Sequence, residues 1–396
     1  MTTVLVSNPS ADVYGADLQL LDSVTGIVNR GMTVVVSLPS DGPLVPQLLE
    51  RGAMVRFDRV PVVRRAALSV KGISVLAAQH AAGTVRLVRT LRTLRPDVVY
   101  VNTMTIPVWI AAARLVGAPV VCHVHEAEDA DSRLVLKGLL APLRVTTALI
   151  ANSKASVDAM TSIYPSLRQR TTLIYNGIPD PPADPGPPPA APGARWRVAA
   201  VCRLSPRKAP DVAIEAMAIL RAQGRDVTLT IYGTAFAGYE WFERRLRERA
   251  AQPELAGSVT FGGYVAPVWD ALAAADAVVA PSLREPFGNA VVEAQLARRP
   301  VIASATLGHL ETVQDGETGL LVPAGDAAAT AAAIGRLMDD PELTRRLADN
   351  GRTRALSRFS VERYRTEIAD QVAALGALTC FRSRKGRHTG PPPALE

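Results

Sequence analysis

The chain has 396 residues, of which 48% are apolar, so it can bury two cores of ordinary domain size, and none of its apolar runs reaches membrane-spanning length. Its three cysteines are odd in number and far apart, which argues against a disulfide framework and indicates a reducing, cytoplasmic compartment. The formal net charge is +7, and the sequence concentrates this excess in one segment of the first quarter of the chain.

Short β-branched runs alternate with amphipathic stretches through the first half of the chain. Between the first two runs, Leu18, Leu21 and Val28 lie on one face of a helix that Gly31 would end. Continuous apolar strands separated by helices indicate a parallel sheet that is covered on both faces. The expected strands are residues 3–9, 33–39, 54–58, 97–103, 119–126 and 148–153.

The positive charge is concentrated between Arg59 and Arg95, a segment with eight Lys or Arg and no acidic residue. Arg86, Arg89 and Arg92 recur every third residue beside a separate apolar face, which predicts a basic amphipathic helix. One interpretation is a core-facing helix with a solvated basic side. The other is docking on an anionic membrane surface, which would imply a lipid-linked acceptor. Because the segment has few aromatic residues, we expect no nucleic-acid partner.

A stretch rich in proline and glycine at 179–195 interrupts the alternation and predicts a linker or exposed loop. The alternation then resumes, which predicts a second sheet with strands at 197–204, 227–233, 258–264, 277–282, 300–304 and 318–324. The predicted organisation is an N-terminal Rossmann-like domain (1–178), a linker or loop (179–195), a C-terminal Rossmann-like domain (196–359), a helix packing back on the N-terminal domain (360–378) and a disordered tail (379–396).

Residues that follow the strands are the candidate site residues, since open parallel sheets bind ligands at the carboxyl ends of their strands. Arg203 and Lys208 flank a Ser-Pro turn just before a helix, and two cations beside a helix N-terminus favour a diphosphate. Further along, Glu285 lies in a loop and Glu293 in a helix that we expect Asn289 to cap. Such carboxylates suit sugar hydroxyl groups, although Glu293 could simply complement the helix dipole.

The first domain offers a second group of candidates. His125 is preferred to His123 as the site residue, because both lie on one face of the expected strand and His125 is nearer its carboxyl end. The alternative is that His125 is a core or surface histidine without a role in the site. Gly15 would let the backbone approach a ligand or would simply form a turn. No G-x-G-x-x-G follows the first strand, which argues against a nicotinamide dinucleotide. Asp129 and Asp131 are expected to open a helix rather than to bind metal.

The stretch Arg284–Ala294, read as REPFGNAVVEA, resembles the E-x7-E signature of retaining glycosyltransferases of family four. Residues 202–216, 264–282 and 315–326 resemble further segments of that family, in the same order. The resemblance covers nearly the whole chain and implies the α/β GT-B fold, with two Rossmann-like parallel-sheet domains facing across a cleft. The sequence departs from the pattern at Cys202, where Gly is usual, and at Ala209, where Gly commonly follows the lysine.

The resemblance also implies roles for residues. Arg203 and Lys208 would hold the donor diphosphate, and Glu293 would bind the ribose. Glu285 and His125 would be the catalytic residues, in contact with the donor sugar. The other implied donor-binding residues are Phe287, Gly288, Asn289, Tyr264 and Gly15.

The expected activity is therefore transfer of a sugar, with retention of anomeric configuration, from a nucleotide-diphosphate sugar to a glycan or lipid-linked acceptor, without metal or another cofactor. Alternatives are a nucleotide-sugar epimerase or phosphorylase of the same fold, or a non-catalytic sugar-nucleotide-binding protein. The first ten residues lack a basic n-region and a cleavage site, so we expect no secretion signal. The expected location is the cytoplasm, including peripheral association with the inner face of the membrane.

Overall fold

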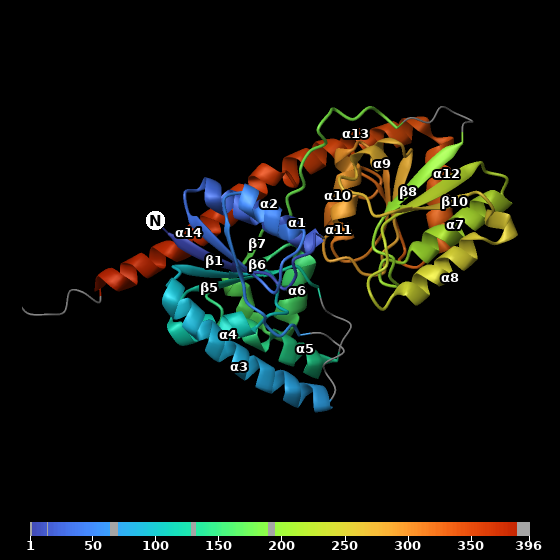
Figure 1. The fold of residues 1–396 in the computed structure, drawn as a ribbon. Helices are drawn as coiled ribbons and strands as arrows, with labels where there is room; N and C mark the ends of the chain where they lie inside the picture. Colours follow the sequence, from blue (N-terminus) through green and yellow to red (C-terminus); the bar gives the residue numbers. More distant parts are fainter. Residues whose placement is uncertain (1, 14, 64–69, 128–131, 189–194, 386–396) are drawn as a thin grey trace, which may run out of the picture. The chain divides into compact units, whose positions relative to one another are not determined.

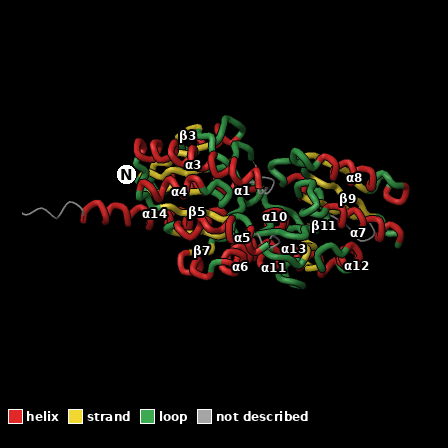
Figure 2. Tube along the Cα trace, turned by 90° about the horizontal axis from the view of Figure 1, so that it is seen from below, coloured by secondary structure: helices red, strands yellow, loops and turns green. Residues whose placement is uncertain are grey.

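The computed structural model describes residues 2–13, 15–63, 70–127, 132–188 and 195–385. The chain forms two compact units (Figures 1 and 2). Unit 1 consists of Met1–Gly177 together with Glu362–Glu396, and unit 2 is Ile178–Val361. In each unit a sheet lies between layers of helices, as Figure 2 shows with strands in yellow and helices in red.

Unit 1 contains a seven-stranded parallel sheet in the order β3-β2-β1-β4-β5-β6-β7. Its strands are β1 (Thr3–Ser7), β2 (Thr33–Leu38), β3 (Met54–Phe57), β4 (Val98–Val101), β5 (Val120–Val124), β6 (Ala148–Ala151) and β7 (Thr171–Leu173). The central strands are rich in Val and Ile and are buried along their length, as expected for a sheet covered on both faces.

Helices cover both faces of this sheet. One face packs against α1 (Gly15–Asn29), α2 (Leu44–Glu50) and α14 (Val361–Lys385). The other face packs against α3 (Val70–Leu94), α4 (Val108–Val116), α5 (Arg133–Leu140) and α6 (Lys154–Ile163). Short 3-10 helices span Ala141–Val145 and Pro165–Arg170.

Unit 2 contains a six-stranded parallel sheet in the order β10-β9-β8-β11-β12-β13. Its strands are β8 (Trp196–Val201), β9 (Val227–Tyr232), β10 (Val259–Gly263), β11 (Ala277–Ala280), β12 (Val301–Ser304) and β13 (Leu320–Val322). One face packs against α7 (Pro210–Ala222), α8 (Glu240–Ala250) and α12 (Ala327–Asp339), and the other against α9 (Trp269–Ala273) and α10 (Asn289–Leu296). The remaining helices are α11 (His309–Thr312), α13 (Pro341–Arg358) and a 3-10 turn at Pro253–Leu255.

The predicted α/β class with two Rossmann-like parallel sheets is confirmed. Each predicted strand overlaps an observed one, and only β7 was missed. This strand has three residues, lies at the edge of the sheet and is not fully buried, so it carries no apolar run that a pattern could detect.

The strand order creates one topological switch point in each sheet. In unit 1 the chain moves outward from β1 to β2 and β3 and then returns to place β4 on the other side of β1. In unit 2 it does the same around β8 and β11. The loops that leave two such neighbouring strands diverge, so their carboxyl ends form a crevice that suits a ligand.

The last helix belongs to unit 1, where α14 (red in Figure 1) packs on α1. The Tyr364 hydroxyl lies 2.7 Å from Ser23 Oγ, and the Arg365 guanidinium donates to Asp22 Oδ1 at 2.7 Å. Gly26 permits this close approach, because a Cβ at that position would overlap the backbone carbonyl of Arg365. The helix runs to Lys385, beyond the end expected at residue 378.

The proline-rich stretch, expected to be a linker or an exposed loop, lies against unit 2 as a loop in its described part. Arg352 forms ion pairs with Asp180 at 2.9 Å and Asp184 at 3.4 Å, and Arg299 Nη1 donates to the Gly186 carbonyl at 2.8 Å. Among the described residues, no helix combines the length and apolar character needed to cross a bilayer.

Candidate active site

The loop after β8 leads into α7 and carries the two predicted phosphate-binding cations. Backbone bonds from Cys202 N to Tyr232 O (2.9 Å) and from Leu204 N to Thr234 O (3.1 Å) extend the pairing with the β9 side beyond the sheet. This close path requires glycine at Gly233, since a Cβ there would overlap the Cys202 carbonyl oxygen. The sequence thus fixes where the loop leaves the sheet at the unit 2 switch point.

Ala209 connects this loop to α7 in a left-handed conformation, with φ 48° and ψ 46°. An L-residue with a Cβ reaches this region at a cost of about 1–2 kcal/mol. The family commonly has glycine at this position, which fits the observed backbone. The departure noted in the sequence therefore leaves the loop geometry intact, at the expense of local strain.

The central feature of the unit 2 switch point is an ion pair between Lys208 Nζ and Glu285 Oε2. Lys208 comes from the loop after β8 and Glu285 from the loop after β11, 77 residues later. Ser282 Oγ also donates to the same Glu285 oxygen at 3.3 Å. The side chains of Lys208 and Glu285 are only 21% and 11% exposed, so water screens their attraction weakly.

The loop that carries Glu285 is fixed on its other side by backbone contacts. Gly308 N donates to the Glu285 carbonyl at 2.8 Å. Gly288, with φ 99°, caps α10, and a Cβ there would lie 2.8 Å from the Cδ2 atom of His309. The prediction that Asn289 caps this helix is wrong, because Asn289 is its first residue. Glu293 accordingly lies beyond the first turn of α10.

The two glutamates have opposite electrostatic environments. Burial alone would raise the pKa of Glu285, but the Lys208 charge, with smaller help from His309 and Arg207, lowers this pKa to about 2. Burial raises the pKa of Glu293 to about 7, against a weaker opposing effect of Lys208. Near neutral pH, Glu285 is therefore a fixed anion, whereas Glu293 exists in both protonation states and can donate or accept a hydrogen bond.

The other residues predicted in unit 2 are arranged less uniformly. The Arg203 guanidinium stacks over the Phe236 ring, 4.0 Å from its centroid. Tyr264 follows β10 and is 51% exposed. Phe287 is buried, with its ring centroid 5.4 Å from that of Phe359, so its side chain anchors the loop and only its backbone can face a ligand.

At the unit 1 switch point, His125 follows β5 and makes a hydrogen bond from Nε2 to Asn102 Oδ1, at 2.9 Å. Asn102 follows β4 and donates from Nδ2 to Asn8 Oδ1, at 2.8 Å, across the switch point. The rings of His123 and His125 lie 4.0 Å apart, which agrees with their expected placement on one face. Burial lowers the pKa of His125 to about 4.

Sequence reasoning missed Asn8 and Asn102. The sequence pattern could have indicated them, since each is a polar residue immediately after a buried strand. Many loops begin with a polar residue, however, so this pattern alone does not identify a site. Gly15 is the first described residue of α1. Asp129 and Asp131 lie outside the described residues. Within the part of the chain that is described, no group of three or more His, Cys, Asp or Glu side chains could hold a metal ion.

The two doubly wound parallel-sheet units, with a cation and two carboxylates at the switch point of unit 2, have the architecture of the GT-B class of enzymes. Comparison with known proteins agrees. Residues 14–180 match the family described as Glycosyltransferase Family 4, and residues 188–354 match the family described as Glycosyl transferases group 1.

The relatives differ in how much of the chain they cover. The D-inositol 3-phosphate glycosyltransferase of Streptomyces coelicolor is 30% identical over 319 residues, which is 71% of this chain and 69% of that protein. EpsD of Bacillus subtilis is 37% identical over 161 residues, only 41% of each chain. The structure of Anabaena HepE in complex with UDP and glucose superposes with a TM-score of 0.79 at 26% identity, over 94% of this chain and 100% of that one.

The chain therefore belongs to glycosyltransferase family 4 and has the GT-B fold.

Proposed function

We propose that the protein is a retaining hexosyltransferase that takes its sugar from a UDP-hexose and needs no metal ion. The observation that carries the proposal is the Lys208–Glu285 ion pair at the unit 2 switch point, with Glu293 nearby on α10. The structures of HepE with UDP and with UDP-glucose, at 25% identity, support uridine as the base.

In the proposed mechanism, the donor diphosphate takes the place of Glu285 as the partner of Lys208. Arg203 and the N-terminus of α7 add positive charge on the same loop. Cleavage of the sugar–phosphate bond leaves negative charge on the diphosphate, and these fixed groups stabilise that charge in the transition state. Cationic side chains thus perform the task that a metal ion has in other phosphate-releasing enzymes.

The two glutamates then act on the two ends of the donor. Glu285, freed from Lys208, accepts hydrogen bonds from hydroxyl groups of the hexose and orients it. Glu293 binds the ribose hydroxyl groups, where a carboxylate can accept two hydrogen bonds at once. Backbone amides of Phe287, Gly288 and Asn289 lie against the sugar and phosphate, while Tyr264 flanks the base.

In the same scheme, His125 contacts the hexose, and Gly15 lets the start of α1 pass close to the donor phosphates or to the acceptor.

Calorimetry with UDP, GDP, ADP and their hexose conjugates tests this proposal, with UDP and UDP-hexoses expected to bind most tightly. Lys208→Ala and Glu293→Ala should weaken UDP binding, whereas Glu285→Ala should mainly slow turnover. Proton NMR of the first product should show the anomeric configuration of the donor, and activity should persist in excess EDTA. Inversion, or UDP binding that is indifferent to Lys208→Ala and Glu293→Ala, would contradict the proposal.

The same experiments separate the alternative activities. An epimerase would release a rearranged hexose without an acceptor, and a phosphorylase would require inorganic phosphate. A non-catalytic binding protein would bind UDP-hexose and never hydrolyse it, even over long incubations without an acceptor.

We further propose a glycan or lipid-linked acceptor, with the basic side of α3 resting on an anionic membrane surface at the inner face of the membrane. Leu87 and Leu91 of this helix are fully buried in unit 1, whereas Arg86, Arg89 and Arg92 are exposed. Because the apolar face already packs in the core, the contact would depend on charge without insertion of the helix. Each well-placed cation would contribute about 1 kcal/mol.

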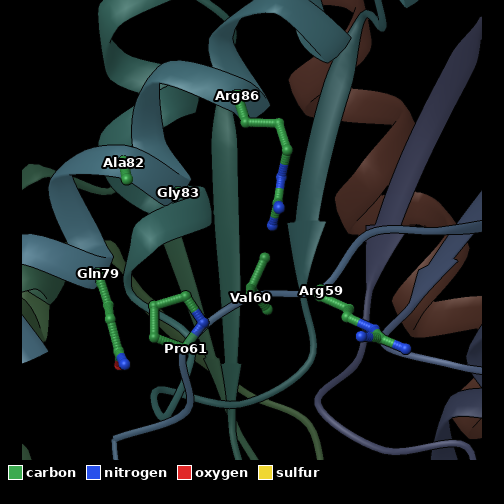
Figure 3. Close-up of a pocket in the computed structure, with 7 residues that line it drawn as sticks. All are labelled: Arg59, Val60, Pro61, Gln79, Ala82, Gly83 and Arg86. Carbon is green, nitrogen blue, oxygen red and sulfur yellow. The ribbon is translucent and has the colours of Figure 1, made fainter.

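A hollow beside this basic side supports the idea. It has a volume of about 390 Å³ and lies between α3 and the chain that follows β3. Figure 3 shows the Arg86 side chain reaching from α3 toward Val60, with Pro61 on one side of Val60 and Arg59 on the other. Both arginines line the hollow, and a guanidinium group is a good partner for a phosphate headgroup.

Sedimentation with liposomes of phosphatidylglycerol or of phosphatidylcholine tests the membrane contact. The protein should bind the anionic liposomes only, and Arg86→Glu with Arg89→Glu should abolish binding. High salt should weaken it strongly, because the contact is electrostatic. Equal non-binding to both liposomes would remove the proposal.

A further inference from the structure

A chain of hydrogen bonds crosses the unit 1 switch point through the side chains of Asp17, Asn8, Asn102 and His125. In each of these hydrogen bonds, only one partner can be the donor. Asn8 Nδ2 donates to the Ser10 carbonyl oxygen at 2.9 Å and to Asp17 Oδ1 at 2.8 Å. A carbonyl oxygen can only accept, so the Asn8 amide must present its nitrogen to this side. Its Oδ1 atom therefore points to the other side, toward Asn102.

The orientation of the Asn8 amide fixes that of the Asn102 amide, which in turn fixes which nitrogen of His125 is protonated. Because Asn8 Oδ1 can only accept, the atom of Asn102 that lies 2.8 Å from it is the Nδ2 donor. The remaining amide oxygen of Asn102 faces His125 Nε2 at 2.9 Å. That oxygen is also an acceptor only, so His125 must carry a proton on Nε2.

His125 carries no second proton near neutral pH, because burial lowers its pKa to about 4. Two titratable groups among the described residues contact His125, namely His123 and Glu126. Burial, with a smaller effect of His125, keeps the pKa of His123 well below its usual value. Glu126 accepts from the His125 backbone nitrogen at 3.0 Å and from Thr103 Oγ1. The Nδ1 atom of His125 thus keeps a lone pair, and it forms no hydrogen bond with a described residue.

We propose that Asp17, Asn8 and Asn102 are positioning residues that hold His125 as the Nε2-protonated neutral tautomer, so that Nδ1 accepts a hydrogen bond from a hydroxyl group of the bound hexose. This inference rests on the proposed function for the identity of the ligand, but the tautomer depends on this chain alone. It makes the site selective for a hydroxyl at that position, since a deoxy or fluoro group cannot donate.

What distinguishes this arrangement is that the group beside His125 Nε2 is the uncharged amide of Asn102. A carboxylate beside Nε2 would favour the imidazolium, whose Nδ1 is a donor and cannot accept from a hydroxyl. An amide fixes the same ring orientation without adding charge. The stacked His123 ring, 4.0 Å away, further limits rotation of His125.

Nitrogen NMR of the full-length protein labelled with ¹⁵N-histidine tests the tautomer directly. The His125 resonances are assigned by their loss in His125→Gln. At pH 7 we expect a protonated Nε2 and an unprotonated Nδ1. A protonated Nδ1 in the wild type, alone or together with Nε2, would overturn the inference whether or not the protein proves to be a hexosyltransferase.

Asn102→Asp tests the positioning role of Asn102, because it keeps the size of the side chain and its acceptor toward His125. We expect the His125 pKa to rise and kcat/KM for UDP-hexose to fall about 10-fold at pH 6, with recovery at pH 8. Asn152→Asp is the matched control, since the buried Asn152 amide oxygen only accepts, from Ser153 Oγ at 3.3 Å and Ser156 Oγ at 3.0 Å. A profile identical in the two variants would exclude a positioning role for Asn102.

Deoxy analogues of the hexose test the ligand contact. With the wild type, one deoxy analogue should have a kcat/KM about 10-fold below that of the parent UDP-hexose. With His125→Gln, the same analogue and the parent UDP-hexose should have equal kcat/KM. If every deoxy analogue loses as much with His125→Gln as with the wild type, Nδ1 does not contact a sugar hydroxyl.

Discussion

The two units share one topology, yet their switch points carry different chemistry. In unit 2 the loops after β8 and β11 bring together a lysine and a carboxylate, with a second carboxylate on α10. In unit 1 the loops after β1 and β4 bring together two asparagine amides, with a neutral histidine after β5. The crevice at the switch point therefore holds charged side chains in unit 2, whereas in unit 1 it holds amides that fix the donor and acceptor of each hydrogen bond.

This difference has an energetic meaning. In the proposed mechanism the unit 2 ion pair opens as Lys208 binds the diphosphate, so ligand binding exchanges one charge-assisted contact for another. In unit 1 the group that contacts His125 is an uncharged amide, so the proposed contact needs no exchange of charges to present the lone pair of His125. A preorganised neutral group suits hydroxyl recognition, whereas a fixed cation suits a leaving group whose charge develops during reaction.

The largest expected effect comes from removing the cation of unit 2. Lys208→Met should lower kcat/KM about 10² to 10³-fold, because the diphosphate loses its fixed charge. Arg225→Met is the control, since Arg225 pairs with Asp339 on the exposed side of α7 and α12, and its activity should stay within about twofold of the wild type. Steady-state kinetics on both variants gives the comparison, and equal losses would contradict a specific role for Lys208.

The backbone under Glu285 should be the next most sensitive feature. Gly288→Ala adds a methyl group 2.8 Å from His309 to a residue with φ 99°, so we expect a loss of at least about 2 kcal/mol in unfolding free energy together with loss of activity. Gly238→Ala has a similar φ of 94° but meets nothing within 4 Å, and should cost only about 1 kcal/mol. Urea denaturation of both variants measures the difference.

The two glutamates should respond oppositely to pH. Glu285, with its pKa lowered to about 2, stabilises the protein above pH 4.5 and loses this effect as pH falls. Glu285→Gln should therefore destabilise unit 2 at pH 7, by up to about 3 kcal/mol, and less at pH 3. Glu293, with its pKa raised to about 7, costs increasing stability as pH rises from 4.5 to 7, so Glu293→Gln should stabilise the ligand-free protein at pH 8 and not at pH 4.5.

Denaturation of these two variants across pH checks this contrast. Parallel changes of the two variants with pH would mean that the two carboxylates share one environment. A Glu293→Gln variant that gains stability at pH 8 while losing affinity for UDP would show that the site carries a stability cost for function.

The smallest effect should come from the helix that anchors to unit 1. Tyr364→Phe removes the contacts of its hydroxyl with Ser23 Oγ at 2.7 Å and Gln19 O at 3.2 Å, which should cost about 1–2 kcal/mol. Hydrogen exchange of α14 should quicken while kcat/KM stays nearly constant. A large loss of activity would mean that this buried network reaches the unit 1 switch point through Tyr100 and His123.

The sequence determined the class of fold and the candidate site residues of unit 2, because both can be recognised from short stretches of sequence. Buried parallel strands appear as apolar runs, and Lys208, Glu285 and Glu293 stand in motifs of fixed spacing next to such runs. The edge strand β7 escaped because three partly buried residues make no run. The cap of α10 was misplaced by one residue, since Gly288 and Asn289 both suit a helix start.

Only the tertiary structure decided which side chains meet. Lys208 and Glu285 are 77 residues apart, and Asn8 and Asn102 are 94 apart, yet each pair lies at the ends of neighbouring strands. Strand order follows from how helices pack on both faces of the whole sheet, which no short window of sequence contains. Burial then sets the charge of each group, so the opposite pKa changes of Glu285 and Glu293 also arise only in the folded chain.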